Sequence, residues 1–188
     1  MKAESHRLLG EYLIQQYMPG LSSRNARVFL MGCVEPDRNP ATYLKGSLRS
    51  QWLRGHNWGN AQRYMARISA RLERKEQLNI WDYYCLGKLI HYIADAFTYA
   101  HNAHFSSNLR GHCGYERMLQ AYFRQYIAGC DGTVPGWYGT VMETVKAYHR
   151  DYVRRPISLH ADASYTVTVC STVLAVLTGV RQLEPALC

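Results

Sequence analysis

Apolar residues recur every three or four positions along most of the chain, the spacing that places them on one face of an α-helix. Leu9, Leu13 and Tyr17 form the first such stripe, and Ile68 and Leu72 belong to a later one. Strand hairpins, internal repeats and low-complexity runs are not apparent in the sequence. The pattern therefore predicts an all-α fold.

Capping residues and helix breakers divide this pattern into separate helices. Ser5 is the predicted N-cap of the first helix, which we expect to run to about residue 18. The second helix is expected to start at Ser22 and to lead to Gly32, because residues 33–47 form a polar segment rich in turn signals. Further helices are predicted at about 60–77, from Asn79 through Asp95, at about 112–129, from Pro135 to Arg155, and at about 162–180.

The last of these segments, residues 162–180, is rich in Val, Thr and Cys. Its β-branched residues favour a strand, but its length and the lack of partner strands favour a buried helix. Asp162, Ser164 and Ser171 dilute it below the roughly 20 mainly apolar residues that a membrane span needs. We therefore expect a core helix, with no transmembrane segment, in one compact domain over residues 1–188.

The composition points to a partner that carries negative charge. The net charge is +8, which suits an anionic membrane surface, a nucleic acid or a soluble phosphate ester, although it also fits a simple solubilising excess. The six cysteines are scattered without a C-x-x-C pair, which argues against a thiolate zinc site and a dense disulfide scaffold. The first residues, MKAESHRLLGEYL, lack the pattern of a signal peptide, so we expect a cytoplasmic protein unless a leader has been removed.

Residues 86–116 hold the chain's densest group of candidate metal ligands. His91 and Asp95 are four residues apart, and so are His112 and Glu116, so each pair projects from one helical face. Imidazole and carboxylate together are a donor set typical of zinc sites. His101 follows Asp95 by six residues and would point away from that face, which suits a second metal. We therefore predict a multinuclear metal site.

Two of these residues also have competing interpretations. Asp95 lies among apolar residues, where a buried carboxylate without a partner would cost several kcal/mol, so a metal or an ion pair is required there. His104 is the rival of His101, and we place it at the rim of the site. His149 and His160 receive no role.

The order H-x-x-x-D, a histidine six residues later, and then H-x-x-x-E resembles the bacterial zinc-dependent phospholipase C family. That family has an all-helical fold shared with the S1/P1-type single-strand nucleases. The resemblance is strongest over residues 86–116 and weaker over residues 1–60. It implies hydrolysis of a glycerophospholipid to diacylglycerol and a phosphorylated head group by metal-activated water, with two or three Zn²⁺ ions as cofactors.

The resemblance also implies further ligands outside the central stretch, in the segments SHRLL, EPDRN and RGHNW. The complete implied set is His6, Asp37, His56, His91, Asp95, His101, His112 and Glu116. Asp95 would bridge two metals, with His6 on one and Asp37, His56 and His91 on the other. The last three residues of the set would hold a third metal. Asp37 is in addition the candidate general base or water-orienting residue.

One departure from the family concerns the amino terminus. In the exported lipases of the family, an N-terminal tryptophan binds a metal, whereas here Met1 comes first and only five residues precede His6. From this departure we expect the metal at His6 to be weakly bound, absent, or completed by water or another group.

The substrate remains open between two chemical classes. A phospholipid or other phosphodiester is the leading candidate, with peripheral contact to an anionic membrane surface, and basic residues such as Arg63, Arg67, Lys45 and Arg49 could steer it. Single-stranded nucleic acid is the alternative, although the Gly-Gly-Asn run usual in the family's nucleases is not seen. A third interpretation is a non-catalytic helical domain with structural or stored zinc.

Overall fold

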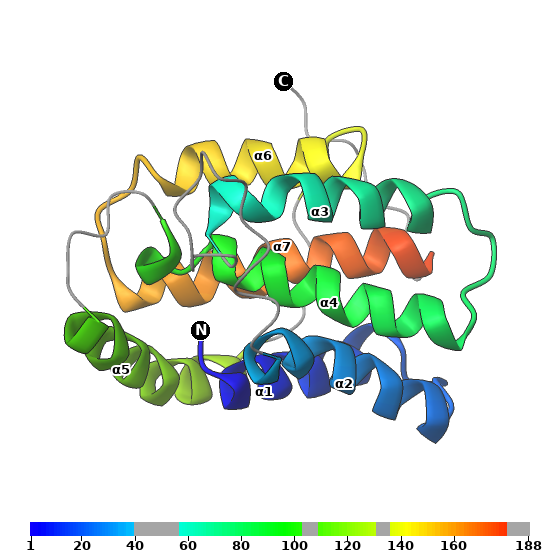
Figure 1. Ribbon diagram of the computed structural model, residues 1–188, viewed down its shortest axis with the longest axis horizontal. Coiled ribbons are helices and arrows are strands. Elements are labelled where there is room, and N and C mark those ends of the chain that lie inside the picture. The colour runs from blue at the N-terminus through cyan, green and yellow to red at the C-terminus, as the bar shows by residue number, and fades with distance from the viewer. Residues whose placement is uncertain (40–56, 103–108, 131–135, 180–188) are drawn as a thin grey trace.

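The computed structural model describes residues 1–39, 57–102, 109–130 and 136–179 (Figure 1). Over these ranges the chain is almost entirely helical and contains no extended strand, which confirms the predicted all-α fold. The helices are α1 (Ala3–Tyr17), α2 (Ser23–Arg38), α3 (Trp58–Leu72), α4 (Ile80–Ala96), the 3-10 helix η2 (Tyr99–His101), α5 (Leu109–Ala128), α6 (Val141–Tyr152) and α7 (Leu159–Thr178).

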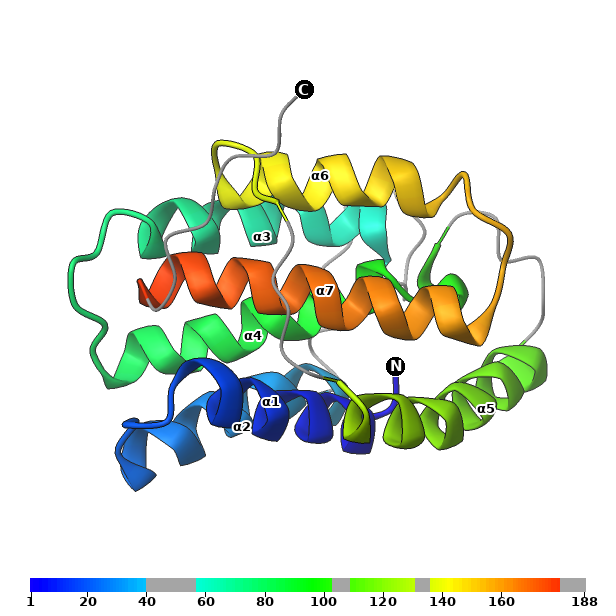
Figure 2. The same ribbon diagram turned by 180° about the vertical axis from the view of Figure 1, so that it is seen from behind.

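The helices lie in three layers, which can be followed from both sides of the molecule (Figures 1 and 2). α1, α2 and α5 form one outer layer, α3 and α6 form the other, and α4 and α7 lie between them. The middle helices are therefore covered on both sides, and every residue of α4 from Leu86 to Ala96 is buried. A carboxylate on this part of α4 has to be compensated from within the protein.

α7 is the predicted core helix, extending from Leu159 to Thr178. Among the described residues, a search by length and composition finds one helix long and apolar enough to cross a membrane, and this helix is α7. However, 67% of its apolar window is buried inside the fold. Its Val, Cys and Leu side chains pack against α1, α4, α5 and α6.

Two glycines allow α2 and α4 to cross in backbone contact. A Cβ atom on Gly87 would lie 2.1 Å from the carbonyl oxygen of Phe29, and one on Gly32 would lie 2.2 Å from that of Tyr84. Side chains of any size would hold the two helices farther apart. Gly32 is therefore a helix-crossing residue, and the prediction that the second helix leads only to Gly32 is wrong.

α2 instead continues to Arg38, with Pro36 buried in its last turns. Proline lacks the backbone N–H that would bond to the carbonyl of Gly32, so one helical hydrogen bond is lost. Packing against α4 outweighs this loss. As a result Asp37, expected in a loop, lies in the final turn of a helix that is pressed against α4.

Local capping signals predicted some helix ends correctly. The side chain of Ser22 accepts a hydrogen bond from the backbone of Asn25 at 3.3 Å and caps α2. Asn79 and Asp82 bond to each other's backbone N–H groups in a capping box that starts α4. These caps act over three residues, so the sequence alone contains the necessary information.

Other predicted ends are wrong. Ser5 is buried inside α1, whose N-cap is Lys2. α6 begins at Val141 because Thr140 and Glu143 form a capping box, whereas Pro135, the predicted start, lies outside the described residues. α3 ends at Leu72, before the predicted residue 77.

The glycine crossing makes a testable prediction. Gly87→Ala forces α2 and α4 apart, so we expect the free energy of unfolding to fall by about 3 kcal/mol, near the upper end of overpacking costs. Gly59→Ala in α3 is the matched control, because its Cβ would have no neighbour within 4 Å. Urea unfolding of both variants measures the difference. Equal, small effects of the two substitutions would contradict the proposed contact.

Candidate metal centre

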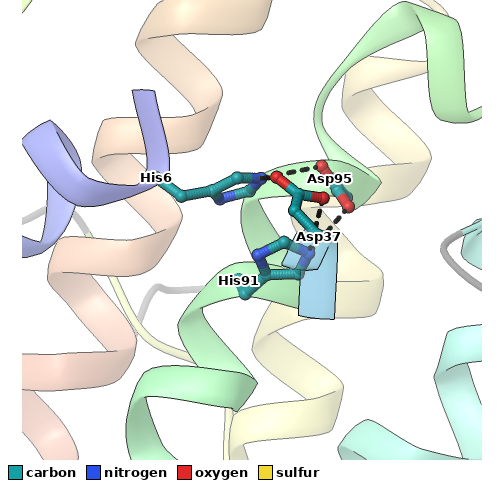
Figure 3. A group of neighbouring side chains, drawn as sticks. All are labelled: His6, Asp37, His91 and Asp95. Carbon is teal, nitrogen blue, oxygen red and sulfur yellow. Dashed lines mark ion pairs between the residues drawn. The ribbon is translucent and has the colours of Figure 1, made fainter. Parts of the chain in front are cut away.

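Three helices bring four candidate ligands together near the middle of the molecule. His6 lies in the first turns of α1, Asp37 at the end of α2, and His91 and Asp95 on successive turns of α4. One ligand atom from each lies within 4.8 Å of all the others, and Figure 3 shows the four side chains pointing toward one another. We refer to these four residues as the first group.

The separations within the first group match those of a zinc site. The Nε2 atom of His91 lies 3.2 Å from Oδ2 of Asp95, and that of His6 lies 3.2 Å from Oδ1 of Asp95. Asp37 is slightly farther away, 3.7 Å from His91 and 3.9 Å from His6. Four ligands bonded at 2.0–2.2 Å around a tetrahedral zinc lie roughly 3.4 Å apart. Two imidazoles and two carboxylates are also a donor set that zinc accepts.

The two histidines of this group are held in an orientation that suits metal binding. Nδ1 of His91 donates to the carbonyl oxygen of Cys33 at 2.8 Å, so Nε2 faces the carboxylates. His6 stacks on His91 with ring centroids 3.8 Å apart. His6 is 1% exposed. Its Nε2 lies 3.2 Å from Oδ1 of Asp95 without the geometry of a hydrogen bond, and its Nδ1 has no hydrogen-bond partner among the described residues. An ion bound there would satisfy a buried polar group that otherwise costs free energy.

The electrostatic environment differs between these histidines. Burial, and then the neighbouring His91, holds the pKa of His6 well below its usual value, which favours the neutral form that binds metals. Burial also lowers the pKa of His91, but the carboxylate of Asp95 outweighs this effect and raises it. A metal at His91 therefore competes with a proton.

A second group, formed by His101, His112 and Glu116, lies next to the first. Nε2 of His101 is 3.2 Å from Oε1 of Glu116, and Nε2 of His112 is 3.5 Å from the same oxygen. η2 carries the first of these residues and α5 the other two. Burial alone would raise the pKa of Glu116, but hydrogen bonds from both histidines lower it strongly. This set also has the composition of a zinc site with room for water or substrate.

Asp95 connects the two groups. Its Oδ2 faces His91, whereas its Oδ1 faces His6 and lies 3.6 Å from Nε2 of His101. Asp95 is fully buried, which by itself raises its pKa, yet the charges of His101 and its other neighbours hold that pKa well below its usual value. A carboxylate whose two oxygens face different sets of candidate ligands has the arrangement expected of a bridge between metals.

The amino group of Met1 also reaches this centre. It lies 2.5 Å from Oδ1 of Asp95, 3.0 Å from Nε2 of His101 and 3.2 Å from Oε1 of Glu116. Burial lowers the pKa of this amine, but the charges of Asp95 and Glu116 outweigh it and raise the pKa to about 10. In the sequence the amino terminus stands out only as a departure from the family, because Met1 comes first instead of a metal-binding tryptophan.

Of the remaining sequence candidates, those that the structure describes do not join either group. His56 and His104 lie outside the described residues, as do Lys45 and Arg49. Arg63 and Arg67 are exposed on α3. His160 is exposed and its Nδ1 lies 3.1 Å from the hydroxyl of Tyr122.

His149, which had no predicted role, supports the turn that carries His101. Its ring stacks on Trp58 with centroids 3.9 Å apart, and Nε2 donates to Oδ1 of Asn102 at 2.8 Å. The amide of Asn102 in turn donates to the carbonyl oxygens of Ala96 and Thr98, each at 3.0 Å. Because that amide group is a donor in both bonds, its oxygen has to accept from His149.

The chain matches a known protein family. The family described as zinc dependent phospholipase C matches residues 5–168, which include every residue of both groups. No curated protein and no solved structure matches the chain.

The buried His149 predicts a specific pH dependence of stability. Burial lowers its pKa to about 4, compared with 6.5 in the unfolded chain. The unfolded state therefore binds more protons between these two values, so stability is complete above pH 6.5 and is lost as the pH falls toward 4. The contribution of this one group is up to about 3 kcal/mol.

His149→Gln keeps an amide donor for Asn102 but cannot titrate. When the pH falls from 7 to 4.5, we therefore expect the free energy of unfolding to decrease less in this variant than in the unaltered protein. Urea unfolding with a chelator present measures this loss without a contribution from metal release. His160→Gln is the control, because an exposed imidazole is solvated in both states. An unchanged pH dependence in His149→Gln would show that this histidine is not buried in its neutral form.

Proposed function

Because the chain belongs to the zinc-dependent phospholipase C family, we propose that it is a phosphodiester hydrolase that cleaves a glycerophospholipid to diacylglycerol and a phosphorylated head group. The observation that carries the proposal is the pair of His/carboxylate groups joined through the buried Asp95. Two adjacent cation sites suit a phosphodiester, since both the attacking and the leaving oxygen develop negative charge.

Seven described side chains would hold two or three zinc ions. They are His6, Asp37, His91, Asp95, His101, His112 and Glu116. Zinc bound there would lower the pKa of a water molecule toward neutrality and withdraw charge from the phosphoryl group. The protein's own contribution is to fix these ligands by burial and by bonds such as the one from His91 to the carbonyl of Cys33.

Asp37 is the residue that we assign to proton transfer. Its side chain is 15% exposed, whereas those of Asp95, His91 and His6 are at most 1% exposed. It also lies farther from both histidines than Asp95 does. A carboxylate at the outer side of the group can orient the attacking water and accept its proton while the other ligands stay in place.

The charge of the chain supports an anionic substrate. With a net charge of +8, the protein attracts phosphodiesters and anionic lipid surfaces, and Arg63 and Arg67 on the exposed side of α3 can contribute to this attraction. We propose a phospholipid rather than a nucleic acid because the matched family is a phospholipase C family. Within this proposal, residues 1–188 act as one catalytic domain.

Metal removal tests this function directly. We expect two or three zinc ions per chain by elemental analysis, and release of a phosphorylated head group from mixed phospholipid–detergent micelles. A chelator should abolish the release, and added zinc should restore it, because the reaction depends on water activated at the metal.

A single-stranded oligonucleotide serves as the competing substrate in the same assay. Its hydrolysis, with the phospholipid left intact, would show that the protein is a nuclease. Head-group release that continues in the presence of the chelator would show that zinc does not carry the reaction.

Asp37→Asn separates a catalytic centre from a structural zinc site. The amide keeps the shape of the side chain but is a poor base, so we expect kcat to fall by at least about 100-fold, the lower range for general-base loss. The zinc of the second group should remain. Asp151→Asn on α6 is the matched control, because Asp151 is exposed and outside both groups. Unchanged turnover of Asp37→Asn would instead indicate a zinc site without a catalytic role.

A further inference from the structure

A buried carboxylate outside both groups connects the segments that carry the second group. Asp162 lies in the first turn of α7 and is 1% exposed. Its Oδ2 accepts hydrogen bonds from the backbone N–H of Tyr99 and the hydroxyl of Tyr115, each at 2.9 Å. Its Oδ1 accepts a bond from the hydroxyl of Tyr152 at 2.7 Å. A single side chain therefore ties η2, α5, α6 and α7 together.

The positions of two of these donors relate them to the candidate ligands. Tyr99 is the first residue of η2, which ends at His101, and Tyr115 directly precedes Glu116 on α5. One oxygen atom, Oδ2 of Asp162, thus holds the backbone near His101 and the helix that carries Glu116.

The second group needs such a connection when it binds a metal. In the structure, Nε2 of His101 and Oε1 of Glu116 face each other at 3.2 Å. Two atoms that bind the same zinc ion cannot also be joined by a proton, so this contact cannot fix their spacing in the loaded site. α5 packs chiefly on α7, which makes α7 the element that sets the position of Glu116.

The chemistry of Asp162 also favours a positioning role over simple core filling. All three of its hydrogen-bond donors among the described residues are uncharged. A buried carboxylate in such surroundings gives less stability than an apolar side chain of similar size, but it fixes the directions of its partners. An acidic residue at a helix N-terminus also interacts with the helix dipole, but that effect does not depend on Tyr115.

We infer that Asp162 is a positioning residue of the second group: through Tyr99 and Tyr115 it sets the separation of His101 and Glu116, and therefore the affinity of this group for zinc. The inference rests on the proposed zinc sites. It assigns Asp162 no contact with zinc or substrate.

Two tyrosine substitutions test this inference and leave the carboxylate in place. Tyr115→Phe and Tyr152→Phe each remove one hydroxyl donor to Asp162, but only the first donor lies next to a ligand of the second group. Zinc affinity is measured by competition with a chromophoric chelator in a His91→Ala background, which disables the first group. We expect Tyr115→Phe to weaken binding by about 10-fold and Tyr152→Phe by less than about 2-fold, as for other residues that orient ligands.

Two further measurements distinguish positioning from general destabilisation. The visible absorption of bound Co²⁺ should change in Tyr115→Phe and not in Tyr152→Phe, because it reports the geometry of the ligands. In a His112→Ala background, where the first group binds the metal, Tyr115→Phe should leave the affinity unchanged. Thermal unfolding should show similar losses of stability for both tyrosine variants.

Equal effects of the two tyrosine variants on zinc affinity, or a loss at the first group as well, overturn the inference, because Asp162 would then act on the fold alone. A protein that binds zinc only through the first group also overturns it, while the proposed hydrolysis could still be measured. If neither background binds zinc, the proposed function itself fails.

Discussion

The compensation of one buried charge determines much of this structure. Asp95 has no exposed surface and lies on the middle-layer helix α4, where an isolated carboxylate would cost several kcal/mol. Four nitrogens face it, from His6, His91, His101 and the amine of Met1. The segments that carry these nitrogens are far apart in the sequence. Attraction to the charge of Asp95 favours packing that brings them to the same point. A divalent cation would provide the same compensation with a fixed geometry, which is why the arrangement suits zinc.

Short-range patterns allowed the sequence to predict the helices and the core of the site. The pairs His91/Asp95 and His112/Glu116 each lie on one helical face, and a four-residue spacing is sufficient to place them there. The capping boxes and the apolar stripes are equally local, so the all-α fold could be recognised without tertiary information. The resemblance to a family then added His6 and Asp37, which the structure places within reach of His91 and Asp95.

Contacts between distant segments could not be read from the sequence. Gly32 was interpreted as a helix end, because its role depends on Gly87, more than fifty residues later. Pro36 and the turn residues near it signalled a loop, but packing against α4 keeps that segment helical as far as Arg38. The hydrogen bonds of Asp162 to Tyr99 and Tyr115 could not be predicted from the sequence either, since a carboxylate in a helix's first turn is usually explained by the helix dipole.

The two ligand groups share Asp95 but depend on different supports. The first group is positioned by the crossing of α2 and α4, where backbone contact at two glycines brings Asp37 beside His91 and lets the carbonyl of Cys33 orient that histidine. The second group is positioned from the other side, by Asp162 and by the bond between His149 and Asn102. Because these supports have no residue in common, a defect in one of them should weaken its own group first. Among the described residues, Asp95 lies against both groups, so a defect in one group can reach the other through this side chain.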